Sequence, residues 1–295
     1  MLEKAINFII KGKRNIDRIV RKNSGYSHDG SVYDIILKSK YGEKYSNIVN
    51  NKLFENFDKS YLYEYCDAWL RTNLRTNISL EDIEQHFNCS ENKEYIKGSL
   101  LMMHYSYRIA QPIIKNLNSE KKRSQEKADK KYINTIFNKV YELLKTDDVL
   151  SLFVASWCLA WSGYNEIDII PTKLYSCLFE RLIELWESNL VYTELERTVS
   201  WALRTIIRPN IQINNINYDR LVECIERKYN EPQNEFDAEV SIMLAFLTGY
   251  WNVKETVKKI HQLRNNNFSV DENLRFWEEI AKNNKLFDKE LKKIK

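Results

Sequence analysis

The 295-residue chain has a formal net charge of +4 and contains only 7 Gly, 4 Pro and 5 Cys. A β-sheet protein needs turn residues about every 8–12 positions. The scarcity of Gly and Pro therefore excludes a β-sheet protein and favours a helical one. The cysteines form no Cys-x-x-Cys pair, and three lie in apolar helical phrases, which indicates a reducing, cytoplasmic setting. The apolar stretches 149–161 and 240–251 are too short to span a bilayer, and residues 1–10 lack the pattern of a secretory signal.

Residues 1–118 are predicted to form an irregular helical N-terminal region, which could hold degenerate repeats. Tyr61, Tyr65 and Trp69 recur at four-residue spacing and therefore share one helix face. We interpret this aromatic stripe as core packing rather than as a stacking platform. Ser79 is followed by acidic residues and has the chemistry of a helix N-cap.

A long helix is expected over residues 92–117, kinked or ended near Gln111 by Pro112. Residues 119–131 contain no large apolar side chain, so we interpret them as a connector or a solvated first turn. The boundary between the N-terminal region and a repeat array at 119–295 is placed there. The array is expected to be one continuous unit that ends in capping helices.

From residue 136 the chain repeats itself with two alternating helical phrases. The first phrase occurs at 136–144, 178–186 and 221–229, at offsets of 42 and 43 residues. The second phrase lies between these copies, beginning at Val154, Val199 and Val240. A period of about 40–47 residues is typical of arrays built from helix pairs. A capping box of Thr193 and Glu196 is predicted to open the helix that carries the second copy of this phrase.

On this period and apolar pattern, residues 132–265 resemble HEAT and armadillo repeats. The resemblance implies an all-α fold, a right-handed α-solenoid of antiparallel helix pairs, with a scaffold or recognition role. Asp237 and Arg204 are candidate fragments of the Asp/Arg ladder that many HEAT repeats contain. The N-terminal region 1–118 is not covered by the resemblance.

The motifs of common enzyme classes are missing from the sequence. The closest glycines are Gly25 and Gly30, which excludes the usual phosphate-binding loops, and there is no Gly-x-Ser-x-Gly. His86 and Cys89 are a weak indication of a zinc site. His104 and its neighbours are a weak indication of a catalytic site. We therefore expect no catalytic activity, no cofactor and no metal.

Four tryptophans in the array leave two interpretations open. Trp157, Trp161, Trp201 and Trp251 recur at related places, with Arg204 and Arg208 close in sequence. They could line a concave cleft able to hold a base. Because Trp157 and Trp201 occupy the same repeat position, core packing is the favoured interpretation.

The distribution of charge suggests the class of partner. Residues 147–251 contain 8 Lys and Arg against 16 Asp and Glu, a net charge of −8, which suits a basic protein and repels nucleic acid. We therefore predict a protein-binding scaffold, inhibitor or immunity-type protein. The alternative is a nucleic-acid-binding HEAT-like protein, such as a base-excision DNA glycosylase, that uses basic residues 1–22 and 119–131 with the tryptophans. The candidate partner-binding residues are Lys139, Glu142, Glu180, Arg181, Glu184, Glu223, Glu226 and Arg227.

Overall fold

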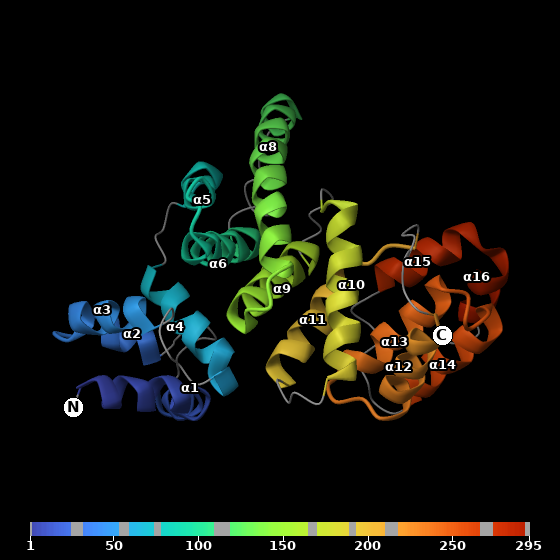
Figure 1. Cartoon of the computed structure of the whole chain (residues 1–295), viewed down its shortest axis with the longest axis horizontal. Coiled ribbons are helices and arrows are strands. Elements are labelled where there is room, and N and C mark those ends of the chain that lie inside the picture. The colour runs from blue at the N-terminus through green and yellow to red at the C-terminus, as the bar shows by residue number, and fades with distance from the viewer. Residues whose placement is uncertain are drawn as a thin grey trace.

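The computed structural model describes residues 2–24, 32–52, 59–73, 78–108, 119–164, 170–188, 193–209, 218–265 and 274–292. Every regular element within these ranges is a helix and none is a strand (Figure 1), which confirms the predicted all-α class. The helices follow one another along the longest axis of the molecule, from α1 at one end to α15 and α16 at the other. None of the helices within these ranges combines the length and the apolar character needed to cross a membrane.

The N-terminal helices surround α4. Helices α1 and α2 contact α4, α3 also packs on it, and α5 packs on α6. Tyr65 and Trp69 of the aromatic stripe are buried in α4, as expected for core residues. The elements are α1 (Leu2–Ser24), α2 (Val32–Leu37), α3 (Gly42–Lys52), the 3₁₀ helix η1 (Lys59–Tyr61), α4 (Leu62–Asn73), α5 (Leu80–Phe87) and α6 (Asn92–Arg108).

The remaining helices continue the chain to residue 292. The helix predicted over 92–117 is α6, and the stretch 109–118, with Pro112, lies outside the described residues. The elements are α8 (Ser119–Leu144), α9 (Val149–Tyr164), α10 (Thr172–Glu187), α11 (Thr193–Ile206), α12 (Tyr218–Asn230), α13 (Asp237–Leu247), α14 (Val253–Asn265), α15 (Leu274–Asn283) and α16 (Lys285–Lys292).

Of the two interpretations of residues 119–131, a connector or a solvated first turn, the connector is wrong. This stretch is the first half of α8, which Figure 1 shows as a long helix that projects beyond its neighbours. Lys, Glu, Gln, Arg and Ala dominate it, and these residues have high helix propensity even without an apolar face to bury. Helices α5 and α6 pack against α8, and α6 packs against α9. The helices on either side of the expected boundary are therefore in contact.

The two repeating phrases occupy two sets of helices. The first phrase lies in α8, α10 and α12, where α8 contacts α10 and α10 contacts α12. The second lies in α9, α11 and α13, where α9 contacts α11 and α11 contacts α13. Consecutive helices also pack as the pairs α8/α9, α10/α11 and α12/α13. The alternation in the sequence thus corresponds to an alternation in space.

Helix α9 explains why the second phrase is so apolar. It contacts α4, α6, α8 and α11, and its residues from Leu150 to Ala160 are all buried. A helix covered on all sides needs apolar residues on all sides. Gly163 permits the close approach of α11, because a Cβ there would lie 2.7 Å from Cγ2 of Ile206. The core is one cluster that runs from Ile6 in α1 to Phe287 in α16.

Candidate functional site

The eight predicted partner-binding residues lie on the adjacent helices α8, α10 and α12. Four of them are solvent-exposed carboxylates, which we call the carboxylate row: Glu142, Glu180, Glu184 and Glu223. Their exposure leaves them accessible to a partner. Half of the predicted set are thus exposed carboxylates on one series of neighbouring helices, with the charge that the sequence suggested.

The other four residues are engaged in contacts between helices. Lys139 Nζ donates a hydrogen bond of 3.2 Å to the hydroxyl of Tyr95 on α6. Glu226 accepts a hydrogen bond of 2.7 Å from the hydroxyl of Tyr250, which follows α13. Such contacts join neighbouring helices. These side chains consequently have a structural role that the sequence did not indicate.

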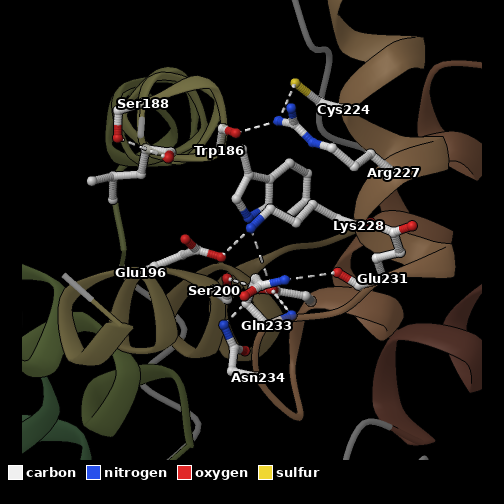
Figure 2. Close-up of polar contacts among 12 residues, drawn as sticks. Trp186, Ser188, Glu196, Ser200, Cys224, Arg227, Lys228, Glu231, Gln233 and Asn234 are labelled. Atoms are coloured by element: carbon white, nitrogen blue, oxygen red, sulfur yellow. Dashed lines mark hydrogen bonds and ion pairs between the residues drawn. The ribbon is translucent and has the colours of Figure 1, made fainter. Parts of the chain in front are cut away.

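Arg181 and Arg227 both bind the C-terminal end of the preceding helix of their row. Arg181 donates from Nε to the carbonyl oxygen of Leu144 and from Nη2 to that of Lys145, each at 2.8 Å. Arg227 donates from Nη2 to the carbonyl oxygen of Trp186, near the end of α10 (Figure 2). The last carbonyl groups of a helix have no intrahelical partner, so each arginine supplies a cap with favourable charge.

A buried polar cluster lies beneath this row, between α11, α12 and the start of α13. Lys228 Nζ lies 2.5 Å from Oε1 of Glu196 and 3.9 Å from Oδ2 of Asp237. Asp237 is fully buried and accepts hydrogen bonds of 2.8 Å from Ser200 Oγ and Asn234 Nδ2. Figure 2 shows Glu196 and Ser200 of α11 facing the segment that carries Asn234. The cluster ties three helices together by charge and hydrogen bonding.

Burial raises the pKa of Glu196, and the charge of Asp237 raises it further, against the hydrogen bond from Lys228 that lowers it. A second ion pair, Arg204 with Glu239, joins α11 to α13, and the two side chains are each only 4% exposed. The sequence suggested Arg204 and Asp237 as fragments of a ladder. Both side chains are buried. Arg204 forms its ion pair with Glu239, and Asp237 lies in the cluster around Lys228.

The four tryptophans of the array are not gathered in one cleft. Trp157 is buried and lies with its ring centroid 5.2 Å from that of Tyr63 on α4. Trp161 and Trp201 are half-buried and meet edge to face at 5.2 Å. Trp251 is buried against Tyr229 near the start of α14. The core interpretation therefore holds for Trp157 and Trp251, and only Trp161 and Trp201 retain a partly exposed ring.

A cavity of about 550 Å³ lies between α3, α4, α5 and α6. No motif in the sequence indicated this cavity, because most of its lining residues come from four separate helices. His86 and Lys97 are at its wall. Its other polar lining residues are Asn50, Asn51, Asn73, Asp82 and Gln85, and Trp69 adds an aromatic surface.

The two basic side chains of this wall share one carboxylate. His86 Nδ1 lies 2.8 Å from Oε2 of Glu94, and Lys97 Nζ lies 2.5 Å from Oε1. Burial raises the pKa of Glu94, but the hydrogen bonds and charges of Lys97 and His86 outweigh it, and the net shift is downward. Cys89, paired with His86 in the weak zinc signal, is a free thiol. Among the described residues, no group of three or more His, Cys, Asp and Glu is arranged to hold a metal ion.

Comparisons with protein families, with curated proteins and with solved structures find no match to this chain. Its function is therefore argued from its own geometry.

Proposed function

We propose that the chain is a non-catalytic recognition protein, a right-handed α-solenoid of antiparallel HEAT-like helix pairs that binds a basic protein partner. The observation that carries the proposal is the carboxylate row, in which Glu142, Glu180, Glu184 and Glu223 are exposed on three successive helices, each packed against the next. The two sets of alternating contacts are those expected of stacked helix pairs, in which each pair touches its neighbours.

The helices that carry the row are fixed to one another, which favours a preorganised binding surface. Arg181 joins α10 to the end of α8, and Arg227 joins α12 to the end of α10. A rigid surface binds at a smaller cost in conformational entropy than a mobile one. Acidic residues in such a row attract a basic partner over a distance and orient it on approach.

Nucleic-acid binding is the weaker candidate. Trp161 and Trp201 form a half-buried aromatic pair, and Phe236 extends it. The ring of Phe236 is stacked with that of Trp201, with the ring centroids 6.2 Å apart. Two of the arginines beside this series are already paired, Arg197 with Glu235 and Arg204 with Glu239, and Arg208 donates to the carbonyl oxygens of Thr205 and Ile207. Phosphate binding depends on basic side chains whose charge is free to replace counterions, so paired arginines contribute little to it.

The test is a triple charge reversal, Glu180→Lys with Glu184→Lys and Glu223→Lys, in the full chain. Proteins captured from the native host are identified by mass spectrometry for the wild type and for the variant. The matched control reverses three exposed carboxylates elsewhere, Glu43, Glu91 and Glu278, with the same change in net charge.

We expect the wild type and the control to capture the same basic protein and the triple variant to lose it, with an affinity that falls as salt rises. Capture that survives in the triple variant contradicts the proposal. Gel shifts with duplex and single-stranded probes at low salt test the other candidate, and binding there that weakens steeply with salt would support it.

A further inference from the structure

The cavity between α3, α4, α5 and α6 is lined by four carboxamides from three helices. Two of them fix each other, because Asn73 Nδ2 donates to Oδ1 of Asn50 at 2.7 Å and to the carbonyl oxygen of Trp69 at 2.8 Å. The bond to a carbonyl oxygen identifies the Asn73 nitrogen, and with it the oxygen of Asn50. Nδ2 of Asn50 can then donate a hydrogen bond to a ligand, and Oδ1 of Asn73 can accept one.

The other two carboxamides extend this set. The side chains of Asn51 and Gln85 are exposed at the cavity and form no side-chain hydrogen bond with the part of the chain that the structure describes. Each offers an amide donor and a carbonyl acceptor. His86 uses Nδ1 on Glu94, so its Nε2 is a further polar atom at the same wall. Donors and acceptors are thus mixed all around one space.

The charged side chains in the described part of the lining already have partners. Lys97 and His86 both contact Glu94, and Asp82 accepts hydrogen bonds from the backbone and hydroxyl of Ser79. An anionic ligand would have to displace Glu94 from Lys97 and His86, and the carboxylate of Asp82 would repel it. The lining therefore suits a neutral molecule better than a phosphate or a carboxylate.

Trp69, the aromatic residue in the described part of the lining, bears on the kind of neutral ligand. It is only 3% exposed, so little of its ring is open to a stacking partner. A nucleobase needs an open ring face to stack on. Hydroxyl groups, in contrast, each offer a donor and an acceptor, which match the mixed donors and acceptors of the carboxamides.

We propose that this cavity is a binding site for a neutral sugar. Its volume of about 550 Å³ lies within the range of small-molecule sites, about 300–1,000 Å³. The carboxamides of Asn50, Asn51, Asn73 and Gln85 hold the hydroxyl groups of the sugar. The site lies on the N-terminal helices, away from the carboxylate row on α8, α10 and α12, so it is independent of the protein-binding role.

The test is isothermal titration of the full chain with glucose, galactose, N-acetylglucosamine and cellobiose, with adenosine and inorganic phosphate as comparison probes. The variant Asn51→Ala/Gln85→Ala removes two exposed carboxamides of the cavity. Its matched control, Asn134→Ala/Asn138→Ala, removes two exposed carboxamides of α8. Circular dichroism checks that both variants are as helical as the wild type.

We expect at least one of the four sugars to bind with a Kd of about 1 mM or tighter. The cavity variant should bind it at least about fivefold more weakly, as the loss of neutral hydrogen bonds requires, and the control should bind it as the wild type does. Three outcomes overturn the proposal: no sugar binds, binding is unchanged in the cavity variant, or only adenosine or phosphate binds.

Discussion

Arg181 on α10 donates a hydrogen bond of 2.8 Å from Nε to the carbonyl oxygen of Leu144, the last residue of α8. Arg227 on α12 makes the equivalent bond to Trp186 near the end of α10. Two successive helix ends in one row are therefore capped by the following helix. The guanidinium group suits this task, because its planar fork can reach two carbonyl groups at once.

Arg181→Ala is expected to lower the free energy of unfolding by about 1.5–3 kcal/mol, because the carbonyl groups of Leu144 and Lys145 lose charged hydrogen bonds. Arg181→Lys should recover only part of the loss, since an ammonium group cannot match the two-pronged geometry. Urea denaturation measures the difference. The exposed neighbour Glu180 supplies the control, and Glu180→Ala should change the stability by less than about 0.5 kcal/mol. Equal effects of the two alanine variants would contradict the capping role.

The buried pair of Arg204 and Glu239 is expected to behave as a coupled unit. Arg204→Met should cost about 3–5 kcal/mol, because it leaves the carboxylate of Glu239 buried without this charge partner. The double variant Arg204→Met/Glu239→Met should regain most of that loss, since apolar side chains can fill the same space. A double-mutant cycle in urea measures the coupling free energy. Additive losses from the two single variants would rule out a direct interaction.

Glu94 is expected to make the stability of the fold depend on pH in the acidic range. Its pKa is lowered from 4.5 in the folded chain by Lys97 and His86, so the folded state favours the carboxylate. The stabilisation is fully present above the ordinary pKa and is lost as the pH falls through the lowered one. Glu94→Gln should reduce stability near neutral pH and flatten the profile between about pH 5 and pH 3.

The control for this profile is Glu91→Gln, which alters an exposed carboxylate three residues earlier. Urea midpoints at a series of pH values give both profiles. If Glu94→Gln loses stability on acidification as steeply as the wild type, the shared contact with His86 and Lys97 is not the source of the dependence.

Cys89 is expected to be the first thiol to react in the native protein. It is half-buried, whereas Cys66, Cys158, Cys177 and Cys224 are buried. Burial also raises the pKa of Cys158 to about 12 and that of Cys177 to about 11, which depletes the reactive thiolate. A thiol reagent followed by absorbance at mildly alkaline pH should show one fast phase, absent from Cys89→Ser, with the others released by denaturant. Several fast phases in the native wild type would show that the buried thiols are accessible.

The helices could be predicted because their signals are local. Ser79 was expected to cap a helix, and its hydroxyl accepts a hydrogen bond of 3.1 Å from the backbone of Asp82, whose carboxylate binds back. The repeating phrases likewise fall in α8 to α13, because periodic burial leaves a periodic apolar pattern. The second capping box, Thr193 with Glu196, stays a prediction. Helix α11 does begin at Thr193, but its side chain lies outside the described residues, and Glu196 contacts Lys228.

The candidate site was less predictable, because its contacts join residues far apart in the chain. Charged residues at helical spacing indicate a solvated face, yet Arg181 and Arg227 reach carbonyl groups on other helices. Nothing in the local sequence distinguishes such an arginine from one that makes no contact with another helix. The cavity near His86 depends on asparagines from α3 and α4, whose placement requires the tertiary fold.

The arginine caps form in a fixed order during translation, because each arginine follows in the chain the helix end that it caps. Leu144 leaves the ribosome 37 residues before the side chain that completes its helix end, and Trp186 precedes Arg227 by 41. The ends of α8 and α10 therefore lack these hydrogen bonds until the next helix of the row has been translated. The growing chain would consolidate from its N-terminal side, one helix pair behind the point of synthesis.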